Sequence, residues 1–201
     1  GGGTTDLAMF MKGSLWHTVV IDVGGQHLTH DLAVGLGAPF EAAEQLKLRF
    51  GSAMASRVPS DQEVSVDVFG ESGPNTVPRQ LVAEILEARA EEMVNLMLRE
   101  IKRSGYDGLV PAGLVLTGGT AQLPGLRELA RQMTQLPVRV GIPGNLAHMP
   151  PDLRTSENAT GVGLLLWALH NQWVSGDLSE RRQRSPFMER VMRWLKTLLP
   201  G

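Results

Sequence analysis

The fold is decided by the stretch LTGGTAQLPG at residues 116–125, which joins a predicted strand at residues 113–117 to a predicted helix from Pro124 to about Gln135. Two consecutive glycines at the end of a strand let the backbone lie flat against a base or a ribose. The same glycines would also suit a purely structural turn that needs a left-handed residue. Gly118 and Gly119 are therefore candidates for nucleotide binding, although the turn alone does not separate the two interpretations.

On both sides of this stretch, patterns typical of strands and helices alternate, which predicts an α/β lobe. The β-prone runs from Thr5 to Met11 and from Leu15 to Ile21 are expected to pair as a hairpin across residues 12–14. Pro78 stands where a long helix should begin, because proline is tolerated in the first helical turn. The other expected elements are strands at residues 64–68 and 138–141, helices at residues 28–37, 40–50, 78–104 and 157–173, and loops at residues 70–78 and 142–155.

A second glycine-rich run, formed by Gly1, Gly2, Gly3 and Thr4, stands directly before the first expected strand. Glycines let backbone N–H groups approach phosphate oxygens, and threonine hydroxyls add further donors. A flexible end followed by a hairpin is the alternative interpretation. The run is thus a candidate phosphate-binding loop.

Glu44 and Lys47 lie three residues apart on one expected helix and therefore share a face of it. An exposed ion pair is the ordinary interpretation and would contribute only about 0.3–0.5 kcal/mol to stability. The functional alternative is a pair that reaches the ribose hydroxyls and the adenine of a nucleotide.

The composition excludes several classes of protein. The 201 residues contain no cysteine, which rules out disulfide scaffolds, thiolate metal sites and cysteine nucleophiles. A formal net charge of −2 gives no reason to expect nucleic acid as a partner. No apolar run approaches the roughly 18–20 residues that a membrane-spanning helix needs. His27 and His30 share one helix start, but without a third ligand in view we expect no metal site.

Taken in order, these motifs resemble the FtsA branch of the actin, Hsp70 and hexokinase superfamily. The resemblance spans essentially all of residues 1–172 and rests above all on GGGTTDL at residues 1–7, GGQHLTHDLA at residues 24–33, LTGGTAQLPG at residues 116–125 and ATGVGL at residues 159–164. It implies an actin-like (ribonuclease H-like) α/β lobe with an outer α/β subdomain. The inner, nucleotide-facing subdomain would comprise residues 1–39 and 106–173, and the outer one residues 40–105.

The resemblance also implies roles for individual residues. Gly1 to Thr4 would contact the β- and γ-phosphates of ATP, Gly25 the ribose and phosphates, Glu44 and Lys47 the ribose and adenine, and Gly118 and Gly119 the adenosine. Arg79, in the outer subdomain, is a candidate for docking the C-terminal tail of FtsZ, against the ordinary interpretation of a solvated arginine.

The family resemblance implies an ATP-binding cell-division scaffold that polymerises, ties the FtsZ ring to the cytoplasmic face of the bacterial membrane at the division site and recruits later division proteins. In this superfamily ATP and Mg²⁺ lie between two lobes, so we expect the chain to be a fragment that holds one side of the nucleotide. We assign no catalytic residue and expect the chain alone to be inactive as an ATPase. The alternatives are a truncated sugar or acetate-type kinase of the same superfamily and the pilus-assembly relative of FtsA.

The last residues show a pattern that needs no family to be interpreted. After a flexible linker expected at residues 174–185, apolar and basic residues recur at helical spacing over residues 186–199, with Trp194 placed at the headgroup level. A basic amphipathic helix on a linker is typical of an in-plane anchor on anionic lipids. A helix packed on its own lobe and a partner-binding helix are the alternatives. The candidate membrane-binding residues are Phe187, Met188, Arg190, Val191, Met192, Arg193, Trp194, Leu195, Lys196, Leu198 and Leu199.

Replacing Trp194 by glutamate tests the anchor, because a carboxylate at the headgroup level is repelled by anionic lipids. We expect the chain to sediment with anionic liposomes and the Trp194→Glu variant to stay largely in the supernatant. Binding of the unaltered chain should weaken as salt is added, since each basic residue near the surface contributes on the order of 1 kcal/mol. Full sedimentation of the variant would contradict a membrane anchor.

Overall fold

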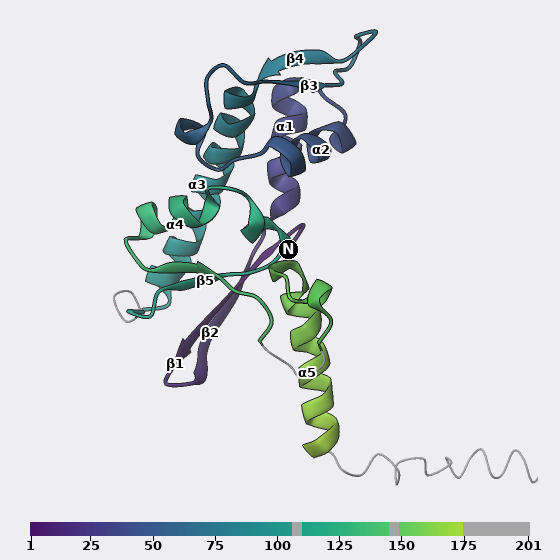
Figure 1. The fold of residues 1–201 in the computed structure, drawn as a ribbon. Helices are drawn as coiled ribbons and strands as arrows, with labels where there is room; N and C mark the ends of the chain where they lie inside the picture. Colours follow the sequence, from purple (N-terminus) through teal and green to yellow (C-terminus); the bar gives the residue numbers. More distant parts are fainter. Residues whose placement is uncertain (106–109, 145–148, 175–201) are drawn as a thin grey trace, which may run out of the picture. The chain divides into compact units, whose positions relative to one another are not determined.

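The structure, a computed structural model, describes residues 1–105, 110–144 and 149–174. Contacts divide the chain into two units, residues 1–160 and residues 161–201. The described strands are β1 (Thr5–Met11), β2 (Ser14–Ile21), β3 (Glu63–Val66), β4 (Asn75–Pro78), β5 (Leu114–Leu116) and β6 (Val138–Val140). The described α-helices are α1 (Gly25–Leu36), α2 (Phe40–Phe50), α3 (Arg79–Arg103), α4 (Leu126–Thr134) and α5 (Ala159–Val174), as Figure 1 shows.

The predicted hairpin is confirmed, since β1 and β2 pair antiparallel from Thr5 opposite Ile21 to Met11 opposite Ser14. The two turn residues between the strands, Lys12 and Gly13, have φ values of 52° and 81°. Two successive positive φ values match the twist of antiparallel strands and favour a tight two-residue connection.

The prediction of a loop at residues 70–78 is wrong for its last four residues. Asn75–Pro78 forms β4, which pairs antiparallel with β3 so that Val64 stands opposite Val77. The glycine, serine, proline and asparagine of this stretch are typical of loops, and the strand is set by its partner rather than by its own composition. A third pair, β5 with β6, is parallel.

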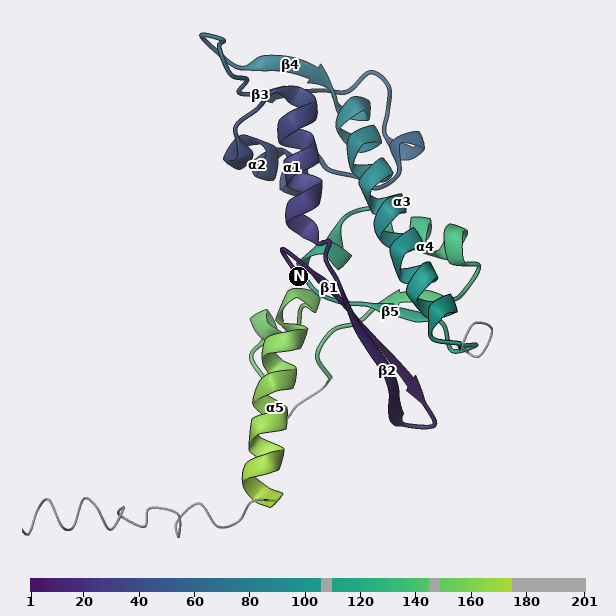
Figure 2. The same cartoon turned by 180° about the vertical axis from the view of Figure 1, so that it is seen from behind.

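The main hydrophobic core of the first unit lies between α1, α2, α3 and β3. Leu28, Leu32, Val82 and Leu86 are at most 1% exposed, and each pair is four residues apart on its helix, which places it on one face. Ala53, Met54, Ala90, Leu126 and Leu129 form a second cluster that joins α3 to α4. The helix α3 therefore contributes to both clusters, and Figures 1 and 2 show it running from β4 to the neighbourhood of α4.

An ion pair with two hydrogen bonds also joins α1 to α3. Nε and Nη2 of Arg89 on α3 donate to the two carboxylate oxygens of Asp31 on α1, at 2.5 and 2.9 Å. This hydrogen bonding to Asp31 raises the pKa of Arg89 above its ordinary value, and Glu92 also contacts the guanidinium. Because a bidentate pair fixes orientation as well as distance, it helps to set the direction of α1.

None of the described helices is long and apolar enough to cross a membrane. The predicted linker from residue 175 onward and the predicted amphipathic helix at residues 186–199 lie outside the described residues. The division into inner and outer subdomains stays a prediction.

Candidate functional site

The first turn of α1 meets the glycine run that precedes β1. The N–H groups of Gly25 and Gln26 donate to the carbonyl oxygens of Gly1 and Gly2, at 2.9 and 2.8 Å. The first N–H groups of a helix have no partner within the helix, so these bonds satisfy donors that would otherwise stay open. The glycine run therefore has a defined position against α1.

This run also presents backbone donors that are free to bind. Within the described residues, the N–H groups of Gly2 and Gly3 donate to no acceptor, and the position of an added Cβ at Gly3 meets nothing within 4 Å. Successive unpaired N–H groups in a glycine-rich backbone form a concavity suited to anions. At Gly24, a Cβ would stand 2.5 Å from the carbonyl oxygen of Gly2, so the approach of helix and loop requires a glycine there.

The Gly118–Gly119 turn reaches the start of α1 from another part of the chain. A Cβ on Gly25 would stand 2.5 Å from Oγ1 of Thr120, a separation that real Cβ atoms do not show. Gly118 has a φ of 95°, which favours glycine. Cβ atoms added to Gly118 and Gly119 would meet nothing within 4 Å. The turn therefore offers open backbone directly beside the first turn of α1.

Glu44 and Lys47 on α2 form an ion pair at 2.8 Å, which lies beside the first turn of α1. Nζ of Lys47 also donates to the carbonyl oxygen of Gly25 at 3.1 Å and to Oγ1 of Thr29 at 2.8 Å. The hydroxyl of Thr29, which is fully buried, hydrogen-bonds to Oε2 of Glu44. An ammonium group has three protons, so these contacts occupy all the donors of Lys47. Within the described residues, Oε1 of Glu44 accepts no hydrogen bond.

The environment of Glu44 acts on its pKa in two directions. Burial raises the pKa of this carboxyl, but the hydrogen bonds from Lys47 and Thr29 and the charge of Lys47 lower it further than burial raises it. The net pKa lies below the ordinary value of 4.5, so Glu44 is ionised at neutral pH. An ionised oxygen at this position is a strong acceptor for a hydroxyl group.

The structure thus gathers Gly1, Gly2, Gly25, Glu44, Lys47 and the Gly118–Gly119 turn around one helix start. Two further residues, Thr29 and Thr120, also lie at this helix start and were not predicted from the sequence. A signal existed for Thr29, because it follows Gly25 by four residues and therefore lies above it on the same face of α1. No local pattern pointed to Thr120.

Arg79 lies apart from this group, at the beginning of α3. Its Nε donates to the carbonyl oxygen of Phe50 at 2.9 Å, and its Nη1 donates to Oε1 of Gln62 at 2.6 Å. These bonds hold the end of α2 and the segment before β3 against α3. The guanidinium of Arg79 therefore stabilises the packing of these segments, whether or not it also binds a partner.

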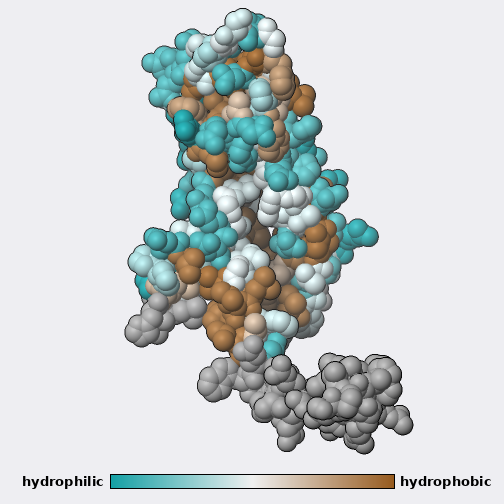
Figure 3. All heavy atoms as spheres, turned by 90° about the vertical axis from the view of Figure 1, so that its right-hand side faces the viewer, coloured by the Kyte–Doolittle hydropathy of each residue, from teal (hydrophilic) through white to brown (hydrophobic). Residues whose placement is uncertain are grey.

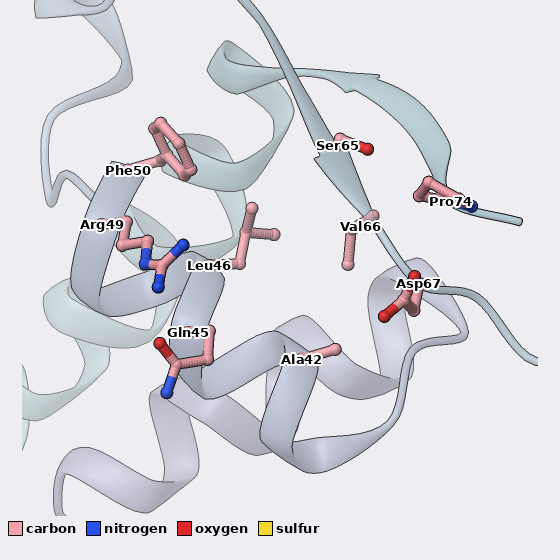
Figure 4. A pocket seen from close by; sticks show the side chains of 9 residues that line it. All are labelled: Ala42, Gln45, Leu46, Arg49, Phe50, Ser65, Val66, Asp67 and Pro74. Atoms are coloured by element: carbon pink, nitrogen blue, oxygen red, sulfur yellow. The ribbon is translucent and has the colours of Figure 1, made fainter.

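A pocket of about 200 Å³ opens between α2 and β3, beside Pro74. Figure 4 shows Leu46 and Val66 facing each other from the helix and the strand, with the charged groups of Arg49 and Asp67 at the margin. Within the described residues, neither Arg49 nor Asp67 forms an ion pair. In Figure 3, the end of the molecule that carries β3 and β4 mixes hydrophilic side chains with smaller hydrophobic patches.

The parts of the chain that the structure describes contain no group of three or more His, Cys, Asp or Glu side chains able to hold a metal ion. His27, one of the two histidines considered from the sequence, accepts the N–H of Gly24 on its Nδ1 at 3.1 Å. This bond satisfies the N–H of the residue that caps the N-terminus of α1.

The chain matches the sequence model of a family described as cell division protein FtsA over residues 1–163. It is 38% identical to the cell division protein FtsA of Pseudomonas aeruginosa, over 98% of this chain and 49% of that protein. The proteins of the same description in Neisseria meningitidis and Bacillus subtilis are 34% and 37% identical, over 98% and 88% of this chain and 49% and 39% of theirs. The chain spans about half the length of the curated relatives it matches, or less.

Among solved structures, MreB5 of Spiroplasma citri bound to ADP has a TM-score of 0.65 with 18% identity, over 88% of this chain and 53% of that chain. The MamK double helical filament has a TM-score of 0.54 with 16% identity, over 82% of this chain and 52% of that chain. At such identities the likeness concerns the fold alone. It confirms the predicted actin-like α/β class.

Replacing Gly25 by alanine should destabilise the chain, because the new Cβ would stand 2.5 Å from Oγ1 of Thr120. We expect the free energy of unfolding, measured by urea denaturation, to fall by about 1–3 kcal/mol. Adding Thr120→Ala removes that oxygen and leaves the Cβ of residue 120 at 3.9 Å, so the double variant should recover most of the loss.

The matched control for this experiment is Gly3→Ala, whose Cβ meets no atom and which should change stability by less than about 0.5 kcal/mol. A double variant no more stable than Gly25→Ala would contradict the proposed contact between the turn and α1.

Proposed function

The chain belongs to the FtsA family of cell division proteins, and from this premise we propose that it is part of an ATP-binding, actin-like scaffold that anchors the FtsZ ring to the cytoplasmic membrane. The observation that carries the nucleotide part is the meeting of three segments at Gly25: the glycine run, the ion pair on α2 and the Gly118–Gly119 turn. Each of them offers a group suited to a different part of ATP.

The phosphates would bind at Gly1 to Thr4, where the N–H groups of Gly2 and Gly3 have no acceptor in the parts of the chain that the structure describes. The open Oε1 of Glu44 accepts a ribose hydroxyl. Lys47 orients Glu44 and the carbonyl of Gly25 and donates nothing further, because its three protons are already engaged. The adenosine lies over Gly118 and Gly119, at which no side chain obstructs it.

The likeness to MreB5 lends support, since that protein is described in complexes with ADP and with AMPPNP. Mg²⁺ would enter as the companion of ATP and would neutralise phosphate charge there. No cluster of three or more potential side-chain ligands exists in the described parts, so the phosphates themselves would supply ligands to the ion. We assign no catalytic residue.

We place the docking site of the FtsZ tail in residues 40–105, at the pocket between α2 and β3. Arg49 offers an unengaged guanidinium at the margin of the pocket, and Leu46 and Val66 offer an apolar floor. Arg79 would act on this site through the carbonyl of Phe50, which it holds at the end of α2.

Assembly of the scaffold at the membrane would involve three further interactions: with lipids, with other copies of the protein and with later division proteins. The helix predicted at residues 186–199 would bind anionic lipids on the cytoplasmic face of the membrane at the division site. Self-association into filaments is supported by the likeness to MamK, described as a double helical filament. Later division proteins would be recruited to this scaffold. The net charge of −2 gives no reason to expect nucleic acid among its partners. The kinase and pilus-assembly alternatives have no counterpart in the family match.

Titration with ATP, followed calorimetrically, tests the nucleotide site. The Glu44→Gln variant should bind ATP about tenfold more weakly or worse, because a hydrogen bond to a charged group contributes about 1.5–3 kcal/mol. ATP that lacks both ribose hydroxyls should show the same loss with the unaltered chain and no additional loss with the variant.

The control for the ATP titration is Glu41→Gln, which alters an exposed carboxylate in the first turn of the same helix. A Glu44→Gln variant that binds ATP as well as the unaltered chain would refute the ribose assignment.

Binding of a synthetic FtsZ C-terminal tail peptide tests the pocket. Charge reversal in Arg49→Glu should weaken binding by tenfold or more, since any such peptide carries at least its terminal carboxylate and the pocket would lose its only cation. Arg99→Glu, on an exposed position of α3, is the matched control. Normal binding by Arg49→Glu together with its loss in Arg79→Gln would place the tail at Arg79 instead.

A further inference from the structure

Ser156 is a polar residue within the core of the first unit to which neither the sequence motifs nor the proposed site assigns a task. It begins the short 3₁₀ turn η4 (Ser156–Asn158) and is only 3% exposed. Its carbonyl oxygen accepts the N–H of Gly118 at 2.9 Å, and its hydroxyl donates to the carbonyl oxygen of Gly118 at 3.0 Å. The two residues, 38 positions apart in the chain, thus bond to each other in both directions.

Further bonds tie this pair to the ends of both parallel strands. Oγ1 of Thr117 lies 3.1 Å from the carbonyl oxygen of Ser156 and 3.1 Å from that of Gly141. The N–H of Gly141 donates to the carbonyl oxygen of Leu116 at 2.7 Å. Ser156 is therefore a junction between the end of β5, the residue after β6 and η4.

The consequence concerns the backbone that would face a nucleotide. Both polar groups of Gly118 bond to Ser156, and its carbonyl oxygen also accepts the N–H of Ala121 at 3.2 Å, within the turn itself. Ser156 is thus the partner from outside the turn, and the peptide planes next to Gly118 cannot rotate without breaking its bonds. Gly118 has a φ of 95° and no side chain, so the conformation of its backbone is held by its hydrogen bonds alone. The orientation of Gly119 and of Thr120, which touches Gly25, then depends on this anchor.

We propose that Ser156 is a positioning residue for the adenosine half of the nucleotide site. It acts through Gly118 and does not touch the ligand, whereas the phosphate half depends on the glycine run and on α1. This inference rests on the proposed nucleotide function. It separates the two halves of the site, because the hydroxyl of Ser156 contacts the turn and makes no bond to the glycine run.

The test compares two probes, ATP and inorganic tripolyphosphate, in calorimetric titrations of the full chain and of Ser156→Ala. Without this hydroxyl the turn would adopt the orientation that receives adenosine in a smaller fraction of the molecules, and apparent affinity falls with that fraction, so ATP should bind about three- to tenfold more weakly to the variant. Tripolyphosphate, which has no adenosine, should bind within about twofold of the unaltered chain. The matched control is Ser52→Ala, another buried serine, whose hydroxyl bonds only to the backbone of Met54. It should leave both affinities unchanged.

Equal weakening of ATP and tripolyphosphate by Ser156→Ala would show that the residue only maintains the fold and would overturn the inference. Unchanged ATP affinity in the variant would overturn it as well. If the unaltered chain bound neither probe, both the proposed nucleotide function and this inference would be refuted. The titration of the unaltered chain alone identifies that case.

Discussion

Gly25 is the point at which the glycine run, α2 and the Gly118 turn meet. Its N–H donates to the carbonyl oxygen of Gly1, its carbonyl oxygen accepts a hydrogen bond from Lys47, and the side on which a Cβ would stand faces Thr120. A helix start has unpaired N–H groups and tolerates close approach only if its residues are small. The position of the Gly118 turn depends on that tolerance, because a Cβ on Gly25 would stand 2.5 Å from Oγ1 of Thr120. The glycine run and α2 are joined to Gly25 by hydrogen bonds.

The contacts around Lys47 follow from the cost of removing charge from water. A partly buried ammonium must be neutralised and hydrogen-bonded, and here Glu44, Thr29 and the carbonyl of Gly25 meet that need. The pair is therefore not the exposed ion pair that its spacing would ordinarily indicate. Lys47 bonds to three neighbours, whereas within the described residues Oε1 of Glu44 accepts no hydrogen bond.

The rest of the first unit serves to hold these loops on rigid elements. The helix α3 contributes to the core around Leu86 and to the smaller cluster around Ala90, and its Arg89 fixes Asp31 on α1. Binding groups are held more accurately when helices and packed cores support them than when loops stand alone. The Gly118 turn is supported in another way, because the buried hydroxyl of Ser156 donates to the carbonyl oxygen of Gly118.

Local sequence patterns were enough to predict the hairpin, the helices and the candidate glycines, because helical periodicity, proline and the conformational freedom of glycine are local properties of the chain. It also indicated Glu44, Lys47 and the Gly118–Gly119 turn, through their order along the chain and their resemblance to a family. The tertiary structure was needed to show that Asn75–Pro78 is a strand, that Lys47 has no free donor and that Thr29, Thr120 and Ser156 lie next to the candidate site residues. Each of these depends on a partner at least nine residues away, and a hydrogen bond between distant residues leaves no periodic mark in the sequence around either of them.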